Sequence, residues 1–412
     1  MRISWRGLCL LLVLALGAAP CLTLGEEAGK ASGDYEPLWP YAEACGFRLG
    51  GAFGAQDMNN RAFMDFLARH FNSLTCTNET KAYSLLNQQM SKLAKDGMPR
   101  MNYAVADRMV AWCQERNIHV RGHVLVWDAY MTDWFFRKGY DSAMPYADRE
   151  TVRARIAFYI SDVMTHFEEK FPGVIDCWDV VNEAIADGPE EWVEGDPRHL
   201  RASRSGSTNL FRDLAGDDYV EYAFLCARDT AERLGADIRL FYNDYNMFMP
   251  GKRDAALALI DSVQGYARDA DGRPRSLIDG IGMQGYLGGY GVQEGCLDPA
   301  LLTSLAESIR LYSEKGVEVQ ITEMAVRNFD QSRAAEHAAF YASLFTDVFM
   351  KANEGEGNPL TAVCIWGIHD APAFDSNSYV YKLNSPYGGL LTLRDQVKTS
   401  FDAMYRALSG SV

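Results

Sequence analysis

The chain has 412 residues, of which 48% are hydrophobic and 23% are charged, a composition typical of a globular protein with a sizeable core. Its net charge is −15 and no run of Lys and Arg stands out, so nucleic acid is not an expected partner, because phosphate binding needs clustered cations. The 8 Trp suit a carbohydrate-binding protein but are equally compatible with an ordinary core.

The first residues have the pattern of a secretory signal peptide. Arg2 and Arg6 precede an apolar run over residues 8–19, which is too short for a comfortable membrane span. We therefore predict a signal peptide over residues 1–25 and a secreted, extracellular protein. A lipid-anchored form through Cys21 is less expected, because Pro20 precedes that cysteine.

Residues 26–45 contain Gly, Ser, Glu and Pro, and we predict a flexible lead-in there. No later apolar run is long enough to span a membrane, so no membrane association is expected after signal removal. Seven cysteines follow the signal segment, an odd number that leaves at least one thiol free in the expected monomer. They are widely spaced with no CxxC pair, so neither a metal site nor a cofactor is expected.

Short runs rich in Val, Ile and Leu alternate with amphipathic patterns along the rest of the chain. We expect strands over residues 49–55, 71–77, 119–127, 174–182, 238–243, 278–286, 318–324 and 361–368. Apolar positions that return every three or four residues predict helices over residues 62–71, 103–116, 151–171, 217–235, 252–269, 299–316, 332–352 and 396–408.

This alternation predicts an α/β fold, because each return to a parallel strand needs a crossover. Eight strand and helix pairs favour a (β/α)8 TIM barrel in a single catalytic domain over residues 46–412. The alternative is an open doubly wound sheet, but no GxGxxG follows the first strand, so a dinucleotide site has no support. Spare length lies in strand-to-helix loops, notably residues 184–217, which in a barrel build the active face.

Polar and aromatic residues stand at the carboxyl ends of successive predicted strands, where a barrel brings side chains to one mouth. They are Asn78, Glu79, Lys81, His123, Trp127, Asp128, Asn182, Glu183, Asn243, Asp244, Tyr245, Asn246, Gln284, Tyr286, Glu323, Trp366, His369 and Asp370. Any one of them could simply cap a strand or solvate a loop. As a set they suit sugar binding, and two carboxylates on separate strands suit glycoside cleavage.

Several characteristic motifs follow one another along the chain: FNSLTCTNETK, ADRMVAW, VRGHVLVWD, WDVVNEA, FRDLAGDDYVEYAFLCARDTA, LFYNDYN, GIGMQGY, QITEM and WGIHD. In order and spacing they resemble glycoside hydrolase family 10, the family of barrel endo-β-1,4-xylanases, and the resemblance covers about residues 50–408. WDVVNEA is the most specific match. The resemblance implies a retaining hydrolase that cleaves internal β-1,4 linkages of xylan or a related β-1,4-linked plant polysaccharide.

By position, the resemblance makes Glu183 the general acid and base and Glu323 the nucleophile. Asn182 would bind the 2-hydroxyl of the sugar at the cleavage point. The other implied substrate-binding residues are Lys81, His123 and Gln284 in that subsite, Asn78 one sugar further along, Trp127 beneath the reacting sugar, Trp366 and Phe374 as aromatic walls, and Tyr245 on the leaving-group side.

Four positions depart from the family pattern. Tyr286 and Ala325 stand where the family has a His and an Asp that support the nucleophile, and we hypothesise that Tyr286 donates its hydroxyl directly to Glu323. Thr77 replaces a Glu and Asp128 a second His, which puts substrate preference in doubt. Two alternatives therefore stay open: a barrel β-glycosidase of altered specificity, for decorated xylan, xylo-oligosaccharides or β-glucan, and a non-catalytic sugar-binding barrel.

Overall fold

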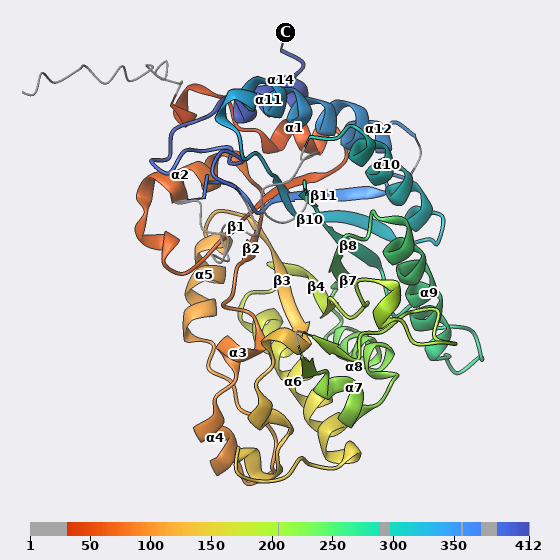
Figure 1. Cartoon of the computed structure of the whole chain (residues 1–412). Coiled ribbons are helices and arrows are strands. Elements are labelled where there is room, and N and C mark those ends of the chain that lie inside the picture. The colour runs from red at the N-terminus through yellow and green to blue at the C-terminus, as the bar shows by residue number, and fades with distance from the viewer. Residues whose placement is uncertain (1–30, 205, 289–296, 356, 372–384, 412) are drawn as a thin grey trace, which may run out of the picture.

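The computed structural model describes residues 31–204, 206–288, 297–355, 357–371 and 385–411. Parallel strands form a closed barrel in the order β11-β1-β2-β3-β4-β7-β8-β10, and β10 pairs with β11 to close the ring (Figure 1). The barrel strands are β1 (Arg48–Phe53), β2 (Ser73–Cys76), β3 (His119–Val126), β4 (Ile175–Asn182), β7 (Arg239–Tyr245), β8 (Gly280–Gln284), β10 (Glu318–Val326) and β11 (Leu360–Ile365). The predicted TIM barrel is confirmed, and each predicted strand overlaps an observed one.

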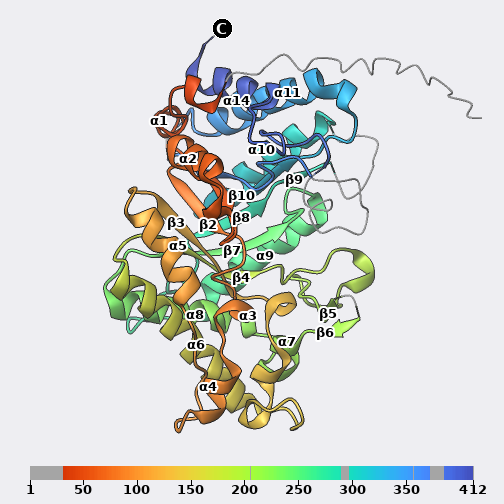
Figure 2. The same cartoon turned by 90° about the vertical axis from the view of Figure 1, so that its left-hand side faces the viewer.

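Helices connect the strands and surround the barrel (Figures 1 and 2). The longer ones are α2 (Arg61–His70), α5 (Ala104–Gln114), α6 (Arg149–Lys170), α8 (Tyr219–Leu234), α9 (Pro250–Tyr266), α10 (Ala300–Ser313), α11 (Ala334–Ser343) and α14 (Thr399–Ser409). Short elements include α1 (Trp39–Ala44), α3 (Ala82–Leu85), α4 (Gln88–Leu93), α7 (Leu210–Ala215), α12 (Met350–Ala352), the bridging pair β5 (Ser203–Arg204) and β6 (Ser207–Thr208), and β9 (Tyr286–Leu287). The predicted helix over residues 332–352 is one run in which a π-helical segment, Leu344–Phe349, joins α11 to α12.

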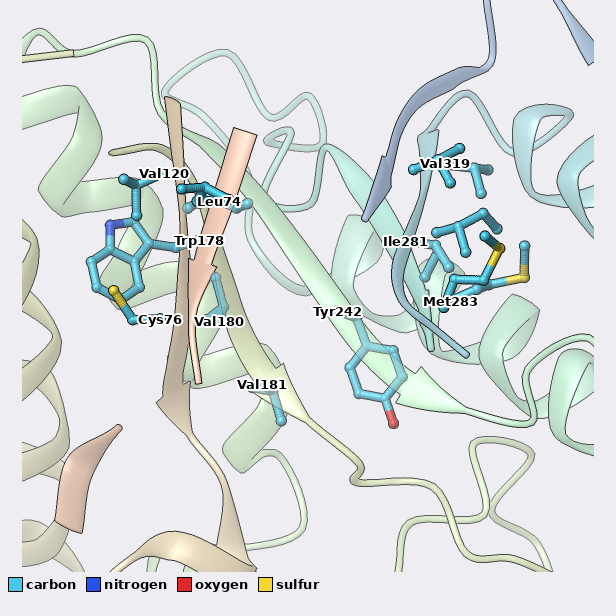
Figure 3. Close-up of a cluster of buried hydrophobic side chains, with 14 of the residues drawn as sticks. Leu74, Cys76, Val120, Trp178, Val180, Val181, Tyr242, Ile281, Met283 and Val319 are labelled. Atoms are coloured by element: carbon cyan, nitrogen blue, oxygen red, sulfur yellow. The ribbon is translucent and has the colours of Figure 1, made fainter. Parts of the chain in front are cut away.

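Outward-facing strand side chains fill the layer between barrel and helices. Leu74, Val120 and Trp178 belong to one buried cluster that extends across neighbouring strands (Figure 3). The indole of Trp178 contacts Phe167 of α6, with ring centroids 5.9 Å apart. It also lies over Gly122 of β3, where an added Cβ would stand 2.2 Å from the indole, so only glycine fits.

The prediction of a flexible lead-in over residues 26–45 is wrong for its second half. Pro40 lies in the first turn of α1, a position that suits proline, and Leu38 is fully buried. The ring of Tyr35 contacts Phe401 of α14 at 5.1 Å, and its hydroxyl donates to Asp402 at 3.0 Å. Apolar and aromatic side chains thus dock this segment onto the last helix.

The predicted signal peptide over residues 1–25 lies outside the described residues, as do residues 26–30 of the lead-in. Within the described ranges, no helix is long and apolar enough to cross a membrane. Cys76, Cys113, Cys177 and Cys364 are free thiols buried in the core, as expected of small apolar residues.

Candidate active site

The WDVVNEA segment delivers a carboxylate to the barrel mouth through an irregular strand end. The pairing of β4 with both neighbours shifts register near Val181, which changes the alternation of side chains between the two faces. Asp179 and Asn182 both make contacts inside the barrel although they are three residues apart. Glu183 then adopts a left-handed backbone conformation with φ of 54°, unusual for a residue with a side chain.

The two predicted catalytic glutamates are joined by a network of amide side chains. Gln284 Nε2 donates to Glu183 Oε1 at 3.1 Å and to Asn182 Oδ1 at 3.2 Å. Asn243 Nδ2 donates to the same Asn182 oxygen at 2.9 Å and to Glu323 Oε1 at 3.0 Å. Because these residues come from β4, β7, β8 and β10, the barrel itself brings the two carboxyl groups into one network.

Glu323 is held as an acceptor by two donors. Tyr286 donates its hydroxyl to Glu323 Oε2 at 2.6 Å, and the hypothesised hydrogen bond is therefore present. Asn243 is itself fixed, because Thr322 donates to its Oδ1 at 2.6 Å. Ala325 is fully buried and lies opposite Tyr286 in the strand register.

Glu183 accepts from a charged donor as well as from an amide. Arg204 Nη1 donates to its Oε2 at 2.9 Å, while Gln284 holds the other oxygen. Burial raises the pKa of Glu183 to about 7 against the opposing effect of Arg204, and the negative charges of Asp244 and Glu323 act in the same direction as burial. Glu183 therefore holds a proton at a pH where an ordinary glutamate has lost it.

A buried ionic network of Arg121 and Asp179 orients the ring of His123. Arg121 donates to both oxygens of Asp179, at 3.1 and 2.8 Å, and its Nε donates to Gln320 at 2.6 Å. Burial works against ionised Asp179, but Arg121 and His123 outweigh it and hold the pKa of Asp179 below its usual range. His123 Nδ1 donates to Asp179 at 2.8 Å, because a carboxylate can only accept, and its Nε2 faces Glu323 at 4.0 Å.

Lys81 stands at the mouth beside aromatic rings. Its ammonium lies 4.9 Å from the ring of Trp127 and 4.6 Å from that of Tyr130, and it donates to Asn78 Oδ1 at 3.1 Å. Burial lowers the pKa of Lys81 to about 8, although the carboxylates of Glu323 and Glu183 oppose that change. The structure therefore brings Asn78, Lys81 and Trp127 together, as predicted.

The aromatic residues predicted to contact sugar have different surroundings. Trp366 lies near His123, with ring centroids 6.0 Å apart. Tyr245 has its hydroxyl bonded to Asp187 at 2.6 Å, and the ammonium of Lys252 lies 3.6 Å from its ring centroid, so this ring belongs to an ionic cluster. Phe374 lies outside the described residues.

Other residues of the site were not singled out from the sequence. Arg204 and Arg201 come from the long loop after β4, and Arg201 donates to the backbone oxygens of Glu183 and Ile185. The only available signal was that this loop carries spare length on the active face. In contrast, His369 and Asp370 at the end of the eighth strand pair locally, with Asp395 and Lys398.

Comparison with known proteins gives a consistent picture. A family model described as glycosyl hydrolase family 10 matches residues 39–392. A putative endo-1,4-beta-xylanase of Caldicellulosiruptor saccharolyticus is 32% identical over 297 residues, which cover 70% of this chain and 86% of that protein. Endo-1,4-beta-xylanase B of Butyrivibrio fibrisolvens is 28% identical over 88% of this chain but only 52% of its own length, so this chain spans about half of that relative. The crystal structure of an endo-1,4-beta-xylanase from Caldicellulosiruptor owensensis has a TM-score of 0.67 at 27% identity and covers 90% of this chain and 99% of that one.

Proposed function

Because the chain belongs to glycosyl hydrolase family 10, we propose that this glycoside hydrolase is secreted and cleaves internal β-1,4 linkages of xylan with retention of configuration. The names of its relatives, which are endo-1,4-beta-xylanases, support xylan as the substrate. Secretion rests on the pattern of residues 1–25, and N-terminal sequencing of protein recovered from the culture medium tests it.

The observation that carries the proposal is the contrast between the two carboxyl groups. Glu183 is buried, and its pKa is raised to about 7, so it is protonated over much of the neutral and acidic range. Glu323 accepts hydrogen bonds from the neutral donors Tyr286 and Asn243, one on each carboxyl oxygen. One group is therefore suited to give a proton and the other to attack, as a double displacement requires.

In the first step Glu323 attacks the anomeric carbon while Glu183 donates its proton to the leaving oxygen. The ester formed on Glu323 removes that negative charge, which makes ionised Glu183 less unfavourable. In the second step Glu183 takes a proton from water, the water oxygen attacks the anomeric carbon, and the carboxylate of Glu323 leaves.

Orphaned polar atoms support a sugar subsite between the two glutamates. Asn182 Oδ1 accepts from both Gln284 and Asn243, which orients the amide. Its Nδ2 is buried and has no hydrogen-bond partner in the described part of the chain, so a sugar hydroxyl would supply the missing acceptor. The same holds for the indole nitrogen of Trp127.

A reducing-sugar assay on plain xylan, substituted xylan, β-glucan and carboxymethyl cellulose tests the proposal. We expect release from xylan, and loss of several orders of magnitude in rate for Glu323→Gln. The matched control is Glu314→Gln, because Glu314 is exposed at the C-terminal end of α10 and pairs with Arg310. This variant should retain full activity. Hydrolysis of β-glucan or cellulose without xylan would instead support altered specificity, and binding without hydrolysis of any substrate would support a sugar-binding barrel.

A further inference from the structure

An arginine from the loop after β4 reaches back to the acid/base residue. Arg204 lies in β5, which pairs with β6 in a small antiparallel ribbon. Its Nη1 donates to Glu183 Oε2 at 2.9 Å and its Nη2 to the backbone oxygen of Glu183 at 2.8 Å. One guanidinium thus contacts both the side chain and the backbone of the residue that must move a proton.

Asp128 accepts from the same guanidinium. Arg204 Nε and Nη2 donate to its two carboxylate oxygens, each at 3.2 Å. Little of either side chain is exposed, 19% for Arg204 and 8% for Asp128, so solvent screens this pair weakly. Asp128 is one of the positions that depart from the family pattern, and its carboxylate is the group that anchors Arg204.

We propose that Arg204 is a positioning residue for Glu183, that Asp128 holds Arg204 in place, and that the sharing of one guanidinium between two carboxylates decides how readily Glu183 gives up its proton. The inference rests on the proposed role of Glu183 as acid and base, and it assigns a function to two residues outside the reacting pair.

The geometry has two consequences. Gln284 holds Oε1 and Arg204 holds Oε2, so the plane of the Glu183 carboxyl group is set by two donors from different elements. The positive charge also favours ionised Glu183 and opposes burial, which raises the pKa of Glu183 to about 7. Asp128 weakens that opposition because it draws on the same cation.

Other charged or titratable groups face this part of the site, and none of them is substituted in the variants that test the inference. They are Arg201 in the same loop, Asp244 of β7, Glu323 of β10 with Tyr286 of β9 bonded to it, Lys81 after β2 and His123 of β3.

The test is the pH profile of kcat/KM on an unsubstituted xylo-oligosaccharide. Glu183 must be protonated in the first step, so activity falls as pH rises through its pKa and the basic limb reports that group. Arg204→Gln should move the basic limb up by about 1 pH unit and lower kcat, because the carboxyl group loses a cation and an orienting donor. Asp128→Asn should move the limb down, because the whole charge of Arg204 then acts on Glu183.

Three comparisons separate this role from a structural one. Asp128→Asn should shift the limb less in an Arg204→Gln background than alone, because Asp128 acts through Arg204. Arg204→Lys keeps the positive charge but loses the planar guanidinium that donates to several oxygens at once. Its basic limb should therefore stay near that of the parent enzyme, while kcat falls. Arg233→Gln, which removes an exposed arginine bonded to Ser161 and Thr165, should leave the profile unchanged.

The inference is overturned if the basic limbs of Arg204→Gln and Asp128→Asn do not move, or if both move in the same direction. The proposed function still stands in that case, provided that the parent enzyme is active. An inactive parent enzyme would contradict the proposed function instead. In that case, ¹³C NMR titration of the glutamate carboxyl groups in the folded protein measures the same opposite shifts of Glu183 without turnover, and equal titration in both variants overturns the inference. Thermal unfolding of each variant identifies any that fails to fold.

Discussion

At the residue scale, the two glutamates differ in the donors that each receives. Glu323 accepts from the neutral donors Tyr286 and Asn243, whereas Glu183 accepts from the amide of Gln284 and the cation of Arg204. The phenol at position 286 donates to Glu323, the proposed nucleophile, without adding a charge. A buried Asp at position 325 would need its own partner, and Ala325 avoids that requirement.

Tyr286→Phe should lower kcat/KM by about 10- to 100-fold, because a hydrogen bond to a charged group contributes roughly 1.5–3 kcal/mol. Tyr159→Phe is the matched control: that hydroxyl is buried without a partner among the described residues, so activity should not change. Equal activity of Tyr286→Phe and the parent enzyme would show that the phenol does not support the nucleophile.

At the element scale, register controls which side chains reach the site. Asn182 of β4 stands opposite Asn243 of β7, and Tyr245 of β7 stands opposite Gln284 of β8. The first of these pairs bonds directly, and Gln284 bonds to Asn182 across β7. The parallel ladder therefore aligns the amides into the network that joins Glu183 to Glu323.

The segment before β1 is an element of the fold rather than a linker. We expect Leu38→Ala to lower the free energy of unfolding by about 2–5 kcal/mol, because the side chain is fully buried beside α1. Leu93→Ala, at a leucine that is 75% exposed, should change it by less than about 0.5 kcal/mol. Chemical denaturation measures both. Equal stability of the two variants would mean that residues 35–45 do not dock as described.

At the scale of the whole molecule, the features that could be predicted are those encoded locally. The alternation of strand and helix patterns repeats along the chain, and the polar residues at strand ends converge once the barrel closes, so Glu183, Glu323, Gln284 and Asn182 were predictable. Arg204 was not, because its partners are set by how the loop over residues 184–217 folds. The docking of Tyr35 onto α14 joins opposite ends of the chain, which no local pattern reveals.

The most direct test of the account is to trap the glycosyl-enzyme with a 2-fluoro-xylobioside that carries a good leaving group, and to map the labelled peptide by mass spectrometry. The account predicts one sugar per protein molecule, esterified to Glu323, and no label on Glu323→Gln. A label on Glu183 or on any other carboxylate, or turnover that inverts the anomeric centre with no trapped sugar, would contradict it.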